Sequence, residues 1–95
     1  MLIVGTTREM YHIRVVNPEH GLVEVRGSDP RLTSGVIGCL ERSIYGDANS
    51  HRRAFRQRWI GFNTRMQIQF ANCLKTFDPT ISLRIEGQGW YYDVF

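Results

Sequence analysis

No aspartate or glutamate occurs between Ala48 and Phe77, a stretch of thirty residues. The same segment holds six basic residues, which are Arg52, Arg53, Arg56, Arg58, Arg65 and Lys75. Its formal charge is therefore +6, whereas the other sixty-five residues carry six arginines against nine acids and sum to −3. This basic centre with mildly acidic flanks predicts contact with an anionic partner, either a nucleic acid or an acidic protein surface.

Cysteine and lysine are scarce. The two cysteines, Cys39 and Cys73, have no CxxC motif and no Cys/His partner at zinc spacing. Neither a disulfide framework nor a zinc site is expected, and both thiols are predicted to be reduced and buried. One lysine stands against eleven arginines. GC-rich coding produces such a bias as readily as selection for guanidinium chemistry does, so the arginine count alone does not indicate phosphate binding.

Long apolar runs are missing too. None approaches the roughly 18 residues that span a bilayer, and the apolar residues 1–4 end at Gly5, too short for a signal-peptide core. We therefore expect a soluble, cytoplasmic protein, and no motif calls for a metal or cofactor. Ninety-five residues with 42% hydrophobic content predict one compact domain over residues 1–95 with a single modest core.

Both ends of the chain are predicted to form β-hairpins. Residues 11–16 and 22–26 alternate apolar and polar side chains around an Asn-Pro-Glu-His-Gly turn at 17–21. Residues 1–4 are expected to add an edge strand. Residues 81–86 alternate in the same way, and after a Gly-Gln-Gly turn the aromatic-rich residues 90–95 predict a closing strand.

The middle of the chain is predicted to be helical. Asp29 and Pro30 are typical of a helix start, and apolar residues then recur every four positions at Leu32, Val36, Leu40 and Ile44. A second helix is expected over 47–62, with an apolar stripe of Phe55, Trp59 and Phe62. Residues 64–77 fit a strand or a helix, and a capping box of Thr64 and Gln67 favours the helix. The predicted fold is α+β, in which both hairpins form one antiparallel sheet and two or three helices pack on one face.

The candidate binding residues lie mostly on the second predicted helix. Arg53 and Arg56 are expected to face solvent, Arg52 and Arg58 flank the apolar stripe, and Arg65 follows the helix. Tyr91 on the closing strand would provide an exposed aromatic anchor. The alternative is a solvated helix whose arginine stems cover the rim of the core.

Two further patterns are better explained by ordinary structural roles. Gly35 and Gly38 have the spacing of the GxxG loop of KH domains, but the two residues between them are apolar, which favours close packing over phosphate contact. Catalysis would need a cysteine paired with His12, His20 or His51, or a histidine among arginines, and the spacing supports neither.

These observations favour a non-catalytic interaction protein that docks on a larger protein or nucleoprotein complex through a basic helix and an aromatic sheet edge. The most specific version is a small inhibitor of a host complex, of the phage or mobile-element type that includes anti-CRISPR proteins. One alternative is a nucleic-acid-binding module that uses residues 52–65 on phosphates. Another is a small toxin-type ribonuclease.

Overall fold

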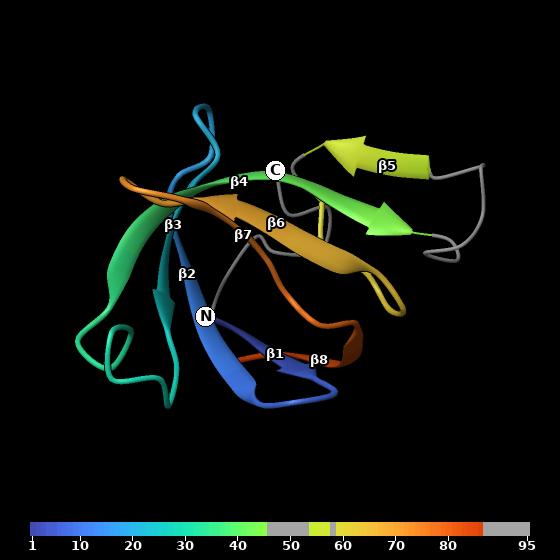
Figure 1. Ribbon diagram of the computed structural model, residues 1–95, viewed down its shortest axis with the longest axis horizontal. Coiled ribbons are helices and arrows are strands. Elements are labelled where there is room, and N and C mark those ends of the chain that lie inside the picture. Colours follow the sequence, from blue (N-terminus) through green and yellow to red (C-terminus); the bar gives the residue numbers. More distant parts are fainter. Residues whose placement is uncertain (46–53, 58, 87–95) are drawn as a thin grey trace.

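The computed structural model describes residues 1–45, 54–57 and 59–86 of the chain. Eight β-strands and no helix are present in these residues, so the predicted α+β fold is wrong and the fold is all-β and antiparallel. The strands are β1 (Leu2–Thr6), β2 (Met10–Asn17), β3 (Leu22–Arg26), β4 (Val36–Tyr45), β5 (Ala54–Gln57), β6 (Arg65–Gln69), β7 (Leu74–Thr76) and β8 (Thr80–Ile85) (Figure 1). In the described part of the chain, no helix is long and apolar enough to cross a membrane.

One sheet contains all eight strands. Seven follow the order β7-β6-β4-β3-β2-β1-β8, and β5 pairs with the second half of β4, beyond the half that pairs with β3. The two ends of this order, β7 and β8, are consecutive in the chain, so the sheet curls back on itself (Figure 1). The amide of Thr80 donates to Thr64, and Thr80 in turn accepts from the amide of Asn63, which ties the start of β8 to the segment before β6. The result is an open barrel.

Register shifts help the sheet to curl. They occur between Gly5 and Thr6, between Val15 and Asn17, and between Leu40 and Arg42. An extra residue on one strand of a pair bends that strand and increases its twist. Three such sites, with the extra residue on β8, β2 and β4, are therefore consistent with a curled rather than a flat sheet.

The core fills the inside of the barrel. It comprises Leu2, Val4, Tyr11, Ile13, Val23, Val25, Leu32, Leu40, Ile60, Met66, Ile68 and Phe77. Phe77 and Tyr11 meet edge to face with ring centroids 4.8 Å apart, which joins the segment after β7 to β2. The hydrophobic contacts therefore bridge the gap between strands that are not paired by backbone hydrogen bonds.

The N-terminal hairpin prediction is confirmed. β2 pairs with β3, and the Asn17 side chain accepts hydrogen bonds from the amides of Glu19 and His20 in the turn. Gly21 closes that turn with a φ of 67°, a backbone conformation that favours glycine. The strand expected at residues 1–4 exists as β1, but it lies between β2 and β8 rather than at an edge. The strand at 81–86 is confirmed as β8, and the closing strand at 90–95 lies outside the described residues.

The helix predictions are wrong because a four-residue spacing of apolar side chains fits a strand as well as a helix. Leu32, Val36 and Leu40 are four residues apart, and four is a multiple of the two-residue period of a strand as well as close to a helical turn. Val36 to Tyr45 form β4, where Gly38 and Leu40 are buried. The third predicted helix is replaced by β6 and β7, so the strand alternative for residues 64–77 is the correct one.

The polar residues that favoured the third helix have other roles. Thr64 donates to the carbonyl of Gly61 at 2.7 Å, and Gln67 bonds both Arg42 on β4 and Thr76 on β7. Of the second predicted helix, residues 54–57 form β5 and the side chain of Phe62 is exposed. Trp59 is half-buried, and a Cβ at Gly61 would overlap its ring.

Candidate functional site: a pocket at the barrel mouth

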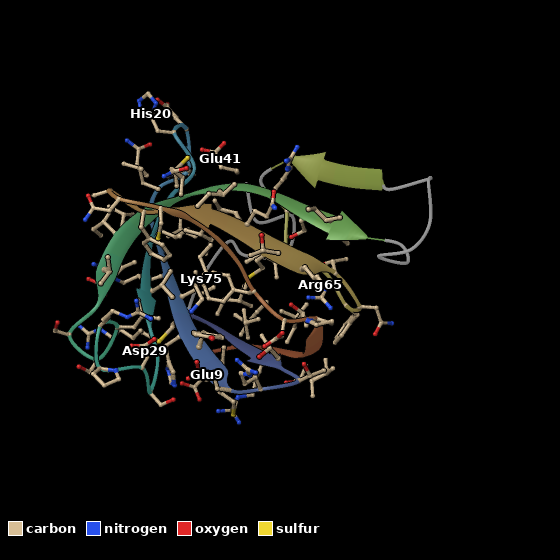
Figure 2. The ribbon with its side chains drawn as sticks, viewed as in Figure 1. Glu9, His20, Asp29, Glu41, Arg65 and Lys75 are labelled. Carbon is tan, nitrogen blue, oxygen red and sulfur yellow. The ribbon has the colours of Figure 1, made fainter. Side chains whose placement is uncertain are left out.

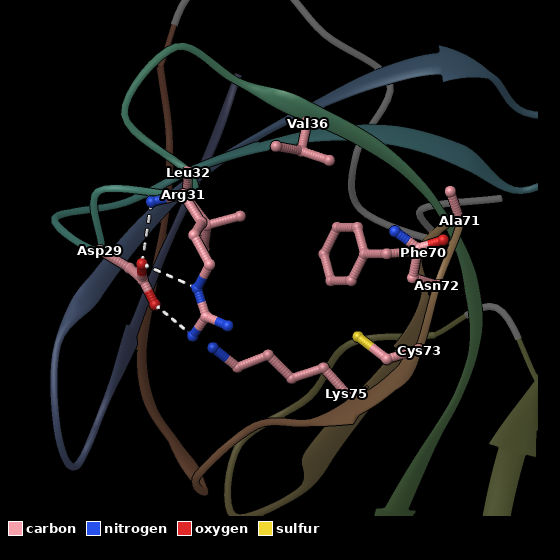
Figure 3. Close-up of a pocket in the computed structure, with 9 residues that line it drawn as sticks. All are labelled: Asp29, Arg31, Leu32, Val36, Phe70, Ala71, Asn72, Cys73 and Lys75. Carbon is pink, nitrogen blue, oxygen red and sulfur yellow. Dashed lines mark hydrogen bonds and ion pairs between the residues drawn. The ribbon is translucent and has the colours of Figure 1, made fainter.

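A pocket opens at one end of the barrel, between the β3–β4 connection and the β6–β7 turn (Figure 3). Its volume is about 290 Å³. Leu32, Val36 and Phe70 supply apolar surface, and Asp29, Arg31 and Lys75 supply charge. We call this the mouth pocket. Barrel mouths are common binding sites in β-proteins.

The β3–β4 connection holds one wall of the mouth pocket. Asp29 accepts from the amide of Arg31 at 2.9 Å through its side chain and from the amide of Leu32 at 2.7 Å through its backbone. Gly35 then donates to Leu32 at 3.0 Å and has a φ of 86°, which turns the chain into β4. The Asp-Pro sequence expected to start a helix thus forms two successive turns, which carry Leu32 into the core.

Phe70 forms the opposite wall because Gly38 makes room for it. A Cβ at Gly38 would lie 2.9 Å from the Phe70 ring and 2.6 Å from a methyl group of Ile68. The absence of a side chain at this buried position of β4 lets Ile68 and Phe70 approach its backbone. The close-packing role expected for Gly38 is confirmed, although it occurs on a strand and not on a helix.

The charges at the mouth are unequally paired. The Arg31 guanidinium donates to both carboxylate oxygens of Asp29, at 3.3 and 3.1 Å, and these hydrogen bonds lower the pKa of that carboxyl group. No carboxylate of the described residues lies within 4.0 Å of the Lys75 ammonium. The two cations and one carboxylate give the mouth a formal charge of +1, and Lys75 carries the unpaired charge.

Aromatic rings hold the Lys75 ammonium in place. Its Nζ lies 4.8 Å from the ring centroid of Phe77 and 5.9 Å from that of Tyr11, and such contacts attract a cation to the ring face. Both rings are buried. The half-buried lysine is therefore positioned toward the pocket that Arg31 also faces, as Figure 3 shows.

Hydrogen bonds that link Tyr11 and Ser28 to Glu9 hold the Tyr11 ring in place. The Tyr11 hydroxyl donates to Glu9 Oε1 at 2.7 Å, and the Ser28 hydroxyl donates to Glu9 Oε2. The hydrogen bond from Ser28, followed by that from Tyr11, lowers the pKa of Glu9. Burial, followed by the hydrogen bond to Glu9, raises the pKa of Tyr11. Tyr11 is therefore a neutral donor at physiological pH.

The sequence-predicted site residues are not gathered at this pocket. Arg65 is exposed at the first position of β6, at the far end of that strand from Phe70, and Figure 2 shows it well away from Lys75. Arg56 lies in β5 opposite Ser43, and β4 separates β5 from β6. Arg52, Arg53, Arg58 and Tyr91 lie outside the described residues. A basic helix is wrong at 54–57, because these residues form a strand.

Sequence reasoning missed Arg31 and gave Lys75 no role beyond its charge. The signal that could have found them is weak: Lys75 is the single lysine of the chain and alternates with Cys73 and Phe77. Pairing of the 70–77 segment with β6 would then have placed these three residues on one face.

Of the candidate thiols and histidines, Cys39, Cys73, His12 and His20 lie in the described part of the chain, and His51 lies outside it. The Cys39 thiol donates to the backbone carbonyl of His20 at 3.3 Å, and Cys73 is exposed on the wall of the mouth pocket, so its predicted burial is wrong. His12 and Arg14 are exposed on the outer face of β2. Among the described residues, no three His, Cys, Asp or Glu side chains are grouped so that they could bind a metal ion.

Comparisons with known proteins add no family to this description. A scan against protein-family models gives no match, and searches of curated proteins and of solved structures find no significant similarity.

Proposed function

We propose that this protein is a non-catalytic interaction protein that binds a larger protein partner through the mouth pocket. The observation that carries the proposal is the combination of an apolar cavity with a positioned, unpaired cation at its rim. Apolar pockets with a few fixed polar groups are the usual form of a binding site. This pocket replaces the basic helix expected from the sequence.

The size of the pocket favours a protein ligand over a cofactor. At about 290 Å³ it lies just below the roughly 300–1,000 Å³ of sites that enclose drug-sized molecules. A cavity of this size accommodates one inserted side chain of a partner. Interfaces gain much of their binding energy from such buried anchors.

The net charge of the chain supports an acidic partner surface. The protein carries a formal charge of +3, and long-range attraction accelerates encounter with an oppositely charged surface. A small inhibitor that blocks a host complex is one form that this function would take.

A capture experiment with a matched control tests the proposal. The tagged protein and its Phe70→Glu variant would each be incubated with lysate of the source organism, treated with nuclease, and analysed by mass spectrometry. We expect a partner that the wild type retains and Phe70→Glu loses, because a carboxylate would enter the apolar wall. The control is Phe62→Glu, since Phe62 is 59% exposed and does not line the pocket. Equal capture by wild type and Phe70→Glu would contradict the proposal.

Nucleic-acid binding is the second candidate. It rests on the six basic residues between Ala48 and Phe77, of which Arg65 is exposed. Phosphate neutralisation would make affinity fall by about 0.7 to 0.9 log units per log unit of salt for each phosphate contacted. A steep salt dependence together with loss of capture after nuclease treatment would favour this candidate over the first.

A further inference from the structure

We propose that the mouth pocket recognises an acidic segment of a partner protein, in which one apolar side chain fills the cavity while a neighbouring carboxylate pairs with Lys75. This inference rests on the proposed function and specifies the chemistry of its ligand. It depends on charge complementarity at the mouth, which follows from three features of the described residues.

The first feature is that Lys75 has an unfilled position for an anion. Its ammonium contacts two aromatic rings and has no carboxylate within ion-pair distance among the described residues. Glu9 and Asp29 are close enough for Lys75 to lower their pKa by charge, but each is already engaged, Glu9 by Ser28 and Tyr11, and Asp29 by Arg31. A half-buried ammonium gains from a carboxylate that approaches through the mouth.

The second feature is the arrangement of the two cations around the opening. Figure 3 shows the side chains of Arg31 and Lys75 directed toward the same space, with Val36 and Phe70 beyond them. Arg31 is held by Asp29, so its guanidinium is oriented before any ligand arrives. An incoming carboxylate would meet Lys75 directly, with Arg31 as a second neighbour.

The third feature is the apolar surface behind the cations. Leu32, Val36 and Phe70 would contact an aliphatic or aromatic side chain, and a purely ionic ligand such as a phosphate would leave this surface unused. The pocket therefore discriminates in favour of a group that carries an apolar part and a negative charge a few bonds apart. A peptide segment with an apolar residue beside an aspartate or glutamate has this character.

Two small probes separate the contributions. N-acetyl-phenylalanine carries an aromatic side chain next to a carboxylate, and N-acetyl-phenylalaninamide is its uncharged equivalent. Titration of each into the full chain would be followed by NMR shifts of Leu32, Val36 and Phe70. We expect the acid to bind roughly three- to tenfold more tightly than the amide, and Lys75→Met to remove that difference while it keeps the aliphatic stem.

The matched control is Arg84→Met, because Arg84 lies on β8 and pairs with Glu86 rather than with the pocket. It should preserve the preference for the acid. Equal binding of acid and amide would overturn the inference, and so would failure of both probes to shift these residues. In either case, loss of partner capture by Phe70→Glu would still support the proposed function, so the two failures are distinguishable.

Discussion

Two basic regions of this barrel differ in how their charges are balanced. On the outer face, Arg14 of β2 and Arg26 of β3 both pair with Glu24, each at 3.4 Å. At the mouth, Asp29 pairs with Arg31 only, and Lys75 keeps its charge among aromatic rings. Both regions hold two cations and one carboxylate, but the outer carboxylate is shared by both of its cations, whereas the carboxylate at the mouth pairs with only one.

The comparison shows why a count of basic residues is a poor guide to a binding site. Exposed ion pairs such as those of Arg14 and Arg26 contribute about 0–1 kcal/mol and mostly keep the surface solvated. A single cation held beside apolar surface gives a partner both an anchor and a charge to match. The mouth is therefore the better candidate, although it has no more cations than the outer face.

The largest expected effect comes from a change that deforms the mouth. Gly38→Ala would place a methyl group 2.6 Å from Ile68 and 2.9 Å from Phe70, so both side chains must shift. We expect a loss of about 1–3 kcal/mol in the free energy of unfolding, together with weaker partner capture. Thermal denaturation would show this as a lower midpoint, by about 4–8 °C per kcal/mol for a domain of this size.

Gly5→Ala is the control for that substitution. Its new methyl group would meet mainly the Ser82 hydroxyl, which can rotate away. We expect a smaller change in the midpoint and unchanged capture. If the two variants melted alike, the close approach of Phe70 to β4 would not be what holds the mouth open.

How much of this could be predicted from sequence differs between the two regions. The outer face comes from the N-terminal hairpin, whose alternation and Asn17 to Gly21 turn predict the two strands that the structure contains. The mouth comes from residues 28–38 and 70–77, where a spacing of four residues satisfies helix and strand alike. These segments form strands because they pair with residues far away in the chain. A single sequence does not show which distant segments pair, so the choice between helix and strand could not be made from it.

The same limit applies to the site residues. The basic segment was found because charge is visible without structure, but Arg56 and Arg65 lie on different strands and do not converge on the mouth. Arg31 lies 44 positions before Lys75 in the chain, and only the curl of the sheet brings them to one opening. Composition predicts contact with an anion without a location, whereas the topology brings Arg31 and Lys75 to one opening.

A prediction of intermediate size concerns the ion pairs of Glu24 on the outer face. Glu24→Gln removes the carboxylate that Arg14 and Arg26 share, so it should convert the outer face into an unpaired cation cluster. We expect stronger retention on a heparin column and an elution that shifts to higher salt, with stability changed by no more than about 1 kcal/mol. Arg14→Gln should shift elution to lower salt or leave it unchanged. Unaltered retention of Glu24→Gln would mean that Glu24 does not mask these arginines.

The smallest expected effect concerns how the stability contributed by the hydrogen-bonded cluster of Glu9, Tyr11 and Ser28 depends on pH. Hydrogen bonds from Ser28 and Tyr11 hold the pKa of Glu9 below its ordinary value of 4.5. A carboxyl group whose pKa is lower in the folded state adds stability above its unfolded pKa, and this contribution is lost as the pH falls through the folded pKa. Glu9→Gln should therefore melt at a lower temperature than wild type at neutral pH, and the difference should shrink below about pH 4.5.

Glu19→Gln is the control, because Glu19 lies in the β2–β3 turn away from the mouth. Melting curves of the three proteins across this pH range test this prediction. A difference in melting temperature between Glu9→Gln and wild type that stays constant at every pH would show that the Glu9 charge does not stabilise the cluster of Glu9, Tyr11 and Ser28.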